Sequence, residues 1–426
     1  MLLRFRITNY ASIRDEVELS FIALNDHSDL AIQQVEQAGV KVLPVAAIYG
    51  ANGSGKSNVI DAFVFMRYVI RSSHQDWRPG APINRRPFKL DEDSKRRPTV
   101  FIVNFVLEGV HYEYGFSIDD HRVLSEWLYS YPKKRPRLFF ERSESSGMKF
   151  GSSLKGRRTN IADLTRPNSL YLSAAAANNH DQLTAIYKWF MYDIFPIKAS
   201  TDLDDSYTVH EWLHHDQDRE RLRSLLRYAD TGVTDLEIEE QEVPDTIAEK
   251  FREFMEVYDP EHAQEGQLGS ELNVNFIHTT GPSSAPLSLE EESSGTLAWV
   301  RLIGPIIVAI RRGGILVVDE LDAYLHPLLA AHLVEIFQDP KNNPSGAQLL
   351  FNTHDVTLLA PSAPSRLRRD EVWFTEKDSE GVTRLTPLID YRVRDGLENV
   401  EKRYLNGRYG GVPFLDDTVL ESIRSE

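Results

Sequence analysis

Apolar and polar residues alternate in two stretches near the start of the chain. Residues 2–8 (LLRFRIT) and 15–22 (DEVELSFI) repeat with a period of two, which is typical of half-exposed strands. We therefore predict an N-terminal hairpin. Residues 99–118 alternate on both sides of Glu108-Gly109 and predict a second hairpin. The β-rich pattern then continues to about residue 150.

Other segments are apolar almost without interruption, which is typical of strands covered on both faces in parallel sheets. Segments with apolar residues at helical spacing follow these buried strands or lie between them. From 181 to 257 the pattern is largely helical. The predicted buried strands include 42–50 and 314–320, and the predicted helices include 57–70, 297–310 and 326–338. This order predicts an α/β fold in which a mixed sheet accompanies an antiparallel β lobe.

Composition narrows the classes of function. The chain has 426 residues, no cysteine and a formal net charge of −16. Attraction to phosphates dominates nucleic-acid affinity, so this charge disfavours generic nucleic-acid binding. Without cysteine, disulfides and thiolate metal sites are excluded. The longest apolar segment, 297–310, is interrupted by an arginine and by Gly304-Pro305, so we predict a cytoplasmic protein with no membrane partner.

The sequence GANGSGKS at 50–57 matches G-x-x-x-x-G-K-[ST] between a buried strand and a helix, the context that a P-loop requires. Glycines let backbone N–H groups surround a phosphate chain, and the helix N-terminus favours the same anion. Lys56 is expected at the β- and γ-phosphates and Ser57 on Mg²⁺. The predicted ATP-binding residues here are Gly50, Asn52, Gly53, Ser54, Gly55, Lys56, Ser57 and Asn58.

Two further strands end in residues with suitable chemistry. ILVVDE at 315–320 brings Asp319 and Glu320 to the carboxyl end of a buried strand, where ligands bind in open α/β sheets. We expect Asp319 to hold Mg²⁺ and Glu320 to position or activate the attacking water. His354 directly follows the strand LLFNT and is expected to contact the γ-phosphate. The alternative is that these residues merely begin loops.

The sequence ESSGT at 292–296 begins the predicted helix before the acidic strand. Ser293 or Ser294 is a suitable helix N-cap, and capping is compatible with anion binding because both use the same free N–H groups. The order of P-loop, this segment, acidic strand and histidine resembles ATP-binding-cassette (ABC) ATPases. In that family a Ser-Gly signature caps the γ-phosphate of nucleotide held by a second subunit.

The resemblance implies roles for further residues. Ser293, Ser294 and Gly295 would be the signature, and sites shared between subunits would require a homodimer or a higher homo-oligomer. ESSGT departs from the transporter consensus and is closer to RecF-, SMC- and OLD-type ATPases. LDAYLHP at 321–327 resembles their D-loop, which would place Asp322 at the dimer interface; as a helix N-cap, Asp322 has an alternative role. Lys56, Glu320 and His354 would be the catalytic residues, with ATP and Mg²⁺ as cofactors.

The flanking segments resemble stand-alone bacterial ATPases of the abortive-infection type (AbiLi/RloA-like) and the ATPase of PARIS anti-phage systems. The segments are LRFRITNYASIRDEVELSF, the β-rich lobe, NSLYLSAAAANNHDQLTAIYKWF at 168–190 and YLNGRYGGVP at 404–413. Such proteins act with a separately encoded effector, often a Toprim-like nuclease. The resemblance implies an ATP-hydrolysing switch that dimerises head to tail around ATP–Mg²⁺ and controls an effector in anti-phage defence. For YLNGRYGGVP, a glycine-rich surface turn is the alternative to a docking segment.

On this interpretation the chain has four parts. Residues 1–180 form the N-terminal part of the ATPase head, with the P-loop and the β lobe, and residues 181–265 form a helical insertion that contacts a partner or the second subunit. Residues 266–390 complete the head with the signature, acidic strand, D-loop and histidine. Residues 391–426 are a C-terminal segment that docks a partner.

Two other functions remain as alternatives. A RecF/SMC-like DNA-repair ATPase would act directly on DNA, which the acidic charge and the lack of a long coiled coil disfavour. The ATPase subunit of a transporter would require a membrane partner, and the large insertion and unusual signature disfavour it.

Overall fold

The computed structural model describes residues 1–25, 29–36, 38–132, 135–197, 208–209, 216–241, 271–323, 325–363, 366–391 and 399–411. The chain forms two compact units. Unit 1 combines Met1–Lys198 with Val308–Glu426, and unit 2 is Ala199–Ile307. The sequence-based boundaries at 180, 265 and 390 stay predictions. The structure places residues 181–197, which they assign to the insertion, in unit 1.

A six-stranded sheet forms the base of unit 1, in the order β11-β15-β16-β5-β17-β18. The first five strands are parallel, and β18 is antiparallel to β17. Their bounds are Ile194–Ile197 (β11), Ile315–Val318 (β15), Gln348–Asn352 (β16), Val45–Gly50 (β5), Val372–Lys377 (β17) and Thr383–Pro387 (β18). Every residue of β5, β15 and β16 is buried, which confirms the prediction from their apolar runs.

A seven-stranded antiparallel sheet forms the second layer, in the order β10-β9-β8-β7-β6-β1-β2. It contains both predicted hairpins, β1–β2 and β6–β7. The strands are Leu2–Thr8 (β1), Val17–Ser20 (β2), Thr99–Leu107 (β6), Val110–Ile118 (β7), Val123–Ser130 (β8), Arg137–Ser143 (β9) and Gly147–Phe150 (β10). A separate two-stranded sheet pairs Gln33–Val35 (β3) with Val40–Val42 (β4).

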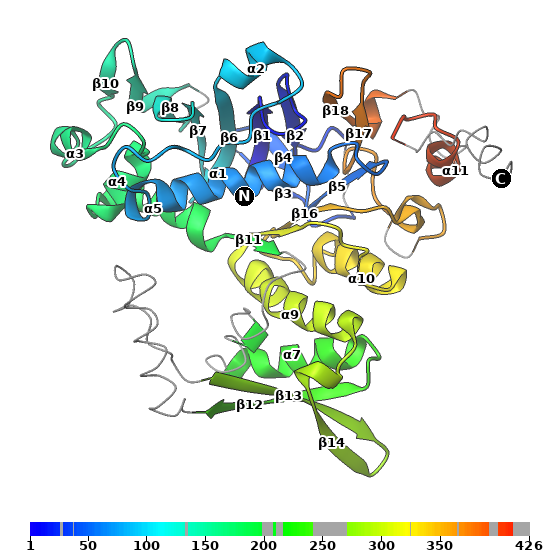
Figure 1. Cartoon of the computed structure of the whole chain (residues 1–426). Coiled ribbons are helices and arrows are strands. Elements are labelled where there is room, and N and C mark those ends of the chain that lie inside the picture. Colours follow the sequence, from blue (N-terminus) through cyan, green and yellow to red (C-terminus); the bar gives the residue numbers. More distant parts are fainter. Residues whose placement is uncertain are drawn as a thin grey trace, which may run out of the picture. The chain divides into compact units, whose positions relative to one another are not determined.

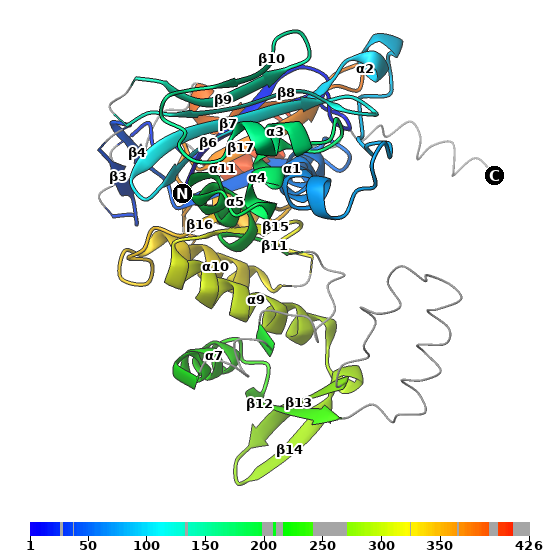
Figure 2. The same ribbon diagram turned by 90° about the vertical axis from the view of Figure 1, so that its left-hand side faces the viewer.

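Helix α1 (Lys56–Gln75) lies between these two layers, as Figures 1 and 2 show. Phe63 of α1 meets the ring of Phe5 on β1 edge to face, with centroids 5.1 Å apart. The helix also contacts β5 and β16 on its other side. The main hydrophobic core of unit 1 therefore surrounds the helix that begins at the P-loop, which holds its N-terminus against both sheets.

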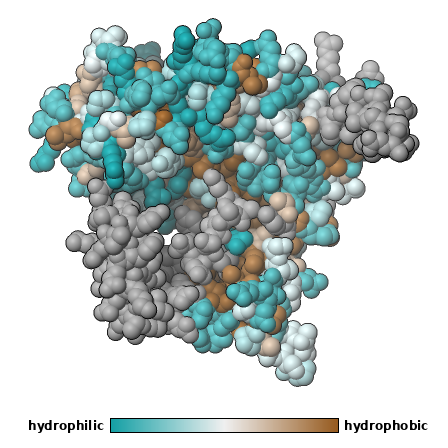
Figure 3. All heavy atoms as spheres, viewed as in Figure 1, coloured by the Kyte–Doolittle hydropathy of each residue, from teal (hydrophilic) through white to brown (hydrophobic). Residues whose placement is uncertain are grey.

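Helices α4 (Tyr171–Ala177) and α5 (Asp181–Tyr192) pack beside α1. A fully buried carboxylate, Glu126 of β8, accepts hydrogen bonds from the backbone N–H groups of Tyr171 and Leu172 at 2.6 and 2.9 Å. It thereby joins α4 to the antiparallel sheet. The remaining elements of unit 1 are α2 (Glu92–Arg96), α3 (Thr159–Leu164), α10 (Pro327–Gln338), η2 (Val356–Leu359), η3 (Leu388–Asp390) and α11 (Val400–Leu405). Hydrophilic residues dominate the surface of the β lobe in Figure 3.

Unit 2 contains α7 (Asp216–Tyr228), a three-stranded antiparallel sheet and most of α9 (Ser294–Arg312). The sheet consists of β12 (Val233–Gln241), β13 (Glu271–Thr280) and β14 (Ser283–Ser288), followed by η1 (Leu289–Glu291). The helical prediction for 181–257 is wrong for β12. In this strand acidic residues surround the buried residues Val233 and Leu236, so its sequence lacks a clear apolar pattern. Residues 242–257 of the predicted helical stretch lie outside the described residues.

Helix α9 passes through Pro305 without ending, although Gly304-Pro305 suggested an interruption. Proline removes one backbone donor. Here the hydroxyl of Thr208 accepts from the N–H of Gly304 at 2.9 Å and donates to the carbonyl of Val300. By length and composition α9 could cross a membrane, but 61% of its apolar window is buried in the structure. Core helices of globular proteins meet the same criterion.

Candidate functional site

The P-loop connects β5 to α1 in a closely packed backbone path. A Cβ on Gly50 would lie 2.3 Å from the hydroxyl and 2.7 Å from the carbonyl of Thr375. A Cβ on Gly55 would lie 2.2 Å from the hydroxyl of Thr383, and Gly55 has a φ of 107°. Gly53 has open space but a φ of 77°, a backbone conformation that favours glycine. The motif therefore needs its glycines for two different reasons.

Lys56 folds back over the loop that precedes it. Its ammonium group donates to the carbonyls of Gly50 at 2.9 Å and Ala51 at 3.2 Å, and it lies 3.4 Å from Nδ1 of His354. Burial lowers the pKa of Lys56 to about 8, while the carboxylates of Asp322, Glu320 and Asp319 act in the opposite direction. A cation held among backbone carbonyls is suited to exchange these acceptors for phosphate oxygens.

Asn352, the last residue of β16, joins three predicted site residues. Its side-chain amide donates to the Asp319 carboxylate at 2.6 Å and to the Ser57 hydroxyl at 3.4 Å. Its side-chain oxygen accepts from the backbone N–H of Glu320 at 2.6 Å. The side chain is fully buried. Asn352 therefore fixes the acidic strand end against the start of α1.

Glu320 has a φ of 57°, a left-handed conformation that is uncommon for a residue with a side chain. The hydrogen bond to Asn352 holds its backbone in this conformation. Such backbone outliers concentrate at functional sites, where the surrounding structure maintains them. The geometry is therefore consistent with a constrained role for the predicted catalytic carboxylate.

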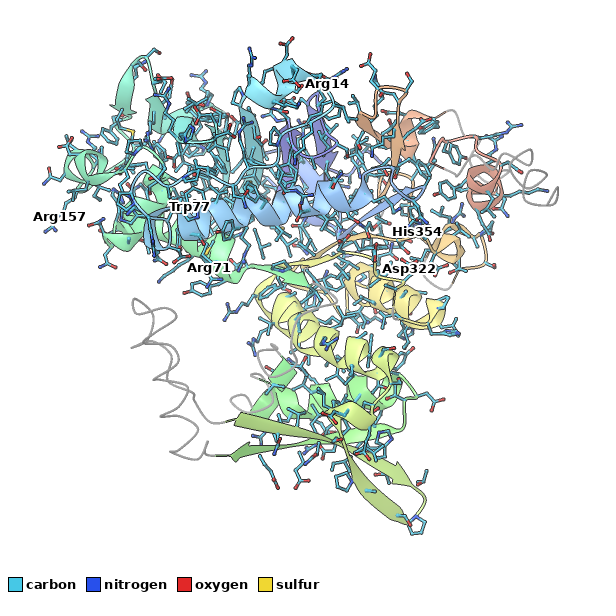
Figure 4. The ribbon with its side chains drawn as sticks, viewed as in Figure 1. Arg14, Arg71, Trp77, Arg157, Asp322 and His354 are labelled. Atoms are coloured by element: carbon cyan, nitrogen blue, oxygen red, sulfur yellow. The ribbon has the colours of Figure 1, made fainter. Side chains whose placement is uncertain are left out.

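The switch loop, which we define as residues 353–355, follows β16. Asp322 accepts from the Thr353 hydroxyl at 2.6 Å and from the backbone N–H of His354 at 3.1 Å. Figure 4 shows Asp322 and His354 close together at this end of the sheet. Burial and the nearby Lys56 ammonium lower the pKa of His354, which Asp322 and Glu320 oppose. A neutral imidazole can accept from Lys56 in this arrangement.

A chain of hydroxyl groups also contacts the P-loop. The Ser54 and Thr375 hydroxyls are 2.6 Å apart, and the Thr383 hydroxyl donates to the Ser54 carbonyl at 2.8 Å. The hydroxyls of Ser12 and Thr383 are 2.7 Å apart, and Asn58 donates to Ser12 at 2.6 Å. Sequence reasoning found Ser54 and Asn58 but missed the other three. Ser12 and the pair Thr375 and Thr383 lie far from the P-loop in the chain, and no motif links them to it.

The structure thus brings together the predicted residues of unit 1 at the carboxyl ends of parallel strands. The oxygen set fits a magnesium ion, because the hydroxyl of Ser57 and the carboxylate of Asp319 share one amide partner and Mg²⁺ prefers such ligands. The N-terminus of α1 and the open space beside Gly53 fit a phosphate chain. Asn352 is the main residue that sequence reasoning missed.

The predicted signature residues Ser293, Ser294 and Gly295 lie in unit 2, at the start of α9. The hydroxyl of Ser293 accepts from the backbone N–H of Thr296 at 3.1 Å, so the predicted N-cap is confirmed at Ser293. Both serines are exposed. The preceding Glu292 contacts the imidazole of His278 on β13, which ties the signature to the sheet of unit 2.

A known protein family matches the part of the chain that contains these residues. A family model described as an AAA domain, putative AbiEii toxin of a type IV toxin–antitoxin system, matches residues 45–360. The match begins at the first residue of β5 and includes the P-loop, the signature, the acidic strand end and the switch loop. It spans 316 of the 426 residues. The chain belongs to this AAA family.

Membership in the AAA family confirms the predicted resemblance to ABC-like ATPases of the RecF, SMC and OLD type. Among solved structures, the chain is similar to an SMC head crystallised with the C-terminal winged-helix domain of ScpA. The two share 14% identity with a TM-score of 0.43, over 90% of this chain and 96% of that chain. No curated protein matches the chain.

Proposed function

We propose that the chain binds ATP with Mg²⁺ at the P-loop and hydrolyses it to ADP and phosphate. The observation that carries this proposal is the convergence of Lys56, Ser57, Asp319, Glu320 and His354 around one strand-end cluster. Membership in an AAA family supports a nucleotide-dependent activity. Mg²⁺ supplies charge neutralisation to the phosphates when it is bound.

Each residue of the cluster has a defined part in this proposal. Lys56 exchanges its backbone carbonyls for phosphate oxygens, and Ser57 and Asp319 hold the metal. Glu320 orients water for attack. His354 lies 3.4 Å from the Lys56 ammonium, so it is placed to respond when that cation moves toward a phosphate.

We further propose that two copies enclose ATP head to tail, with the signature of one facing the P-loop of the other. The free N–H groups at the start of α9 and the exposed serines beside them support this role. The complex would act as a switch that controls a separately encoded effector in anti-phage defence, such as a Toprim-like nuclease. The toxin–antitoxin description of the family supports the defence context.

Steady-state hydrolysis and size-exclusion chromatography of Glu320→Gln test this proposal. Without the carboxylate that orients water, turnover should fall by about 100-fold or more, whereas ATP binding remains. The variant should then show an ATP-dependent increase in molecular mass that the Lys56→Ala variant lacks. Glu36→Gln changes an exposed carboxylate of unit 1 and should leave turnover unchanged. A Glu320→Gln variant that hydrolyses ATP at the wild-type rate would contradict the assignment.

A DNA-repair ATPase of the RecF/SMC type is the second candidate function. The uneven distribution of charge between the two units supports it. Unit 2 contains 24 of the 64 acidic residues and only 7 of the 48 Lys and Arg residues, a net charge of −17. Unit 1 has 40 acidic and 41 basic residues, a net charge of +1. The acidic balance therefore does not apply to the ATPase unit. DNA-stimulated turnover at low salt would support this candidate.

A further inference from the structure

Residues 399–411, which contain α11 and the sequence YLNGRYGG, form a C-terminal segment that packs on β17. The ring of Phe374 on β17 stacks with the rings of Tyr404 and Tyr409, at centroid distances of 5.3 and 5.1 Å. Tyr391 meets the ring of Tyr409 edge to face, and its hydroxyl donates to the Tyr409 carbonyl at 3.1 Å. This aromatic cluster fixes the segment beside the P-loop strand.

The same segment reaches the first glycine of the P-loop. The Tyr404 hydroxyl donates to the carbonyl of Gly411 at 3.0 Å. A Cβ on Gly411 would lie 3.1 Å from Cα of Gly50 and 3.2 Å from the carbonyl oxygen of Thr375. Gly411 also has a φ of 68°, which favours glycine. Backbone therefore packs on backbone at the residue whose carbonyl accepts from Lys56.

Helix α11 also contacts η2, the helical turn directly after the switch loop. Asp355 caps this turn, because its carboxylate accepts from the backbone N–H of Thr357 at 2.9 Å. One C-terminal element thus touches both the loop expected to hold phosphates and the element that follows the predicted γ-phosphate sensor. Neither contact is required by the P-loop motif itself.

Tyr49 lies where these elements meet. Its ring meets that of Tyr404 edge to face at 6.0 Å. Its side chain is fully buried, and its hydroxyl has no hydrogen-bond partner among the residues that the structure describes. The backbone N–H of Thr353 in the switch loop donates to the carbonyl of Ile48, the residue before Tyr49, at 3.1 Å. Burial raises the pKa of Tyr49 well above its ordinary value, and the negative charges of Asp355 and Asp322 act in the same direction. A buried hydroxyl without a partner costs free energy, so a small shift of Asp355 or Tyr404 that supplied one would be favoured.

We propose that residues 399–411 position the P-loop through Tyr404 and Gly411, and that Tyr49 couples this segment to the switch loop. Binding of nucleotide would change the position of the switch loop, and the Tyr49 hydroxyl would gain a partner in that state. This inference rests on the proposed nucleotide site. It assigns YLNGRYGG a positioning role rather than that of a surface turn.

Two conservative substitutions test the proposal. Tyr404→Phe keeps the stacked ring but removes the hydroxyl, and should weaken binding of a fluorescent ATP analogue with Mg²⁺ by about tenfold, since a buried hydrogen bond is worth about that factor. Tyr49→Phe removes the unpartnered hydroxyl, so the melting temperature without nucleotide should stay equal or rise. Leu405→Ala, on the same helix but 59% exposed, is the matched control and should behave as the wild type.

Hydrogen exchange of residues 399–411, with and without a non-hydrolysable ATP analogue, reports the coupling. In the wild type their protection should change on binding, and in Tyr49→Phe this change should disappear although the analogue still binds. An unchanged response in Tyr49→Phe, or wild-type affinity in Tyr404→Phe, would overturn the inference while leaving the proposed function intact. A wild-type protein that fails to bind the analogue would overturn both.

Discussion

The strand-end cluster of unit 1 and the signature segment of unit 2 are built in different ways. In unit 1, hydrogen bonds join residues far apart in the sequence; Asn352 bonds to Ser57, 295 residues away, and to Asp319, 33 residues away. In unit 2, the signature is held by local caps and by the contact between Glu292 and His278. The first region is preorganised by tertiary structure, whereas the second presents a helix start to solvent.

The two units also differ in charge, with a net charge of +1 for unit 1 and −17 for unit 2. A phosphate-binding unit gains from near neutrality, because a large negative charge would repel the nucleotide. The negative net charge of the whole chain therefore comes from unit 2 and not from the unit that contains the P-loop. The composition of a whole chain can therefore differ sharply from that of the unit that contains a site.

The largest effect should follow removal of the cation at the P-loop. Lys56→Ala should abolish detectable ATP binding, with affinity falling by about 100-fold or more, because a buried charge-assisted contact to the phosphates is lost. Isothermal titration with ATP and Mg²⁺ measures this. Lys149→Ala replaces an exposed lysine of the same unit and should keep wild-type affinity. Near-normal binding by Lys56→Ala would show that the cluster is not the nucleotide site.

Asn352→Ala should have the next largest effect, because it removes the residue that orients both expected metal ligands. Loss of such an orienting partner typically costs about 10- to 100-fold in metal affinity or activity. The Mg²⁺ concentration needed for half-maximal turnover should rise accordingly. A variant with an unchanged Mg²⁺ dependence would show that Asn352 acts only in the core.

A buried carboxylate of unit 1 should control part of the pH dependence of stability. Burial raises the pKa of Glu371 to about 8, well above its ordinary value of 4.5. Because the folded state holds this proton more tightly, stability should decrease as pH rises from about 4.5 to about 8. Glu371→Gln keeps an acceptor for Gln338 and Arg368 and should remove this decrease, raising the free energy of unfolding at pH 8 by about 1–3 kcal/mol. Urea unfolding at pH 5 and pH 8 measures it.

The smallest effect should come from the local cap of unit 2. Ser293→Ala removes the hydroxyl that accepts from Thr296 and should lower stability by about 1 kcal/mol. Turnover should fall only a few-fold, because the backbone N–H groups at the start of α9 remain. Ser293→Asp, which can still cap, should restore stability in thermal melts. A loss of turnover as large as that of Glu320→Gln would mean that Ser293 itself takes part in the chemistry.

Much of unit 1 could be predicted from the sequence because its buried strands have uninterrupted apolar runs and its P-loop has fixed spacing. The sequence could not predict the roles of Asn352, Ser12, Thr375 and Thr383. Their partners are distant in the chain, and an isolated polar residue carries no sequence pattern that reveals its function. Strand β12 escaped prediction because glutamates flank its few buried residues and its partner β13 follows only after residue 270. Tyr49 and Tyr404 look like ordinary core aromatics until their contacts are known.

The central claim is that each nucleotide site is shared between two copies. One copy supplies the P-loop and the other supplies the signature. Mixing Lys56→Ala with Ser294→Arg subunits tests it most directly, because each variant alone should be inactive while one hybrid site pairs an intact P-loop with an intact signature. The account predicts that ATP turnover reappears on mixing, in proportion to the hybrid population. Two inactive variants that stay inactive after exchange of subunits would contradict it.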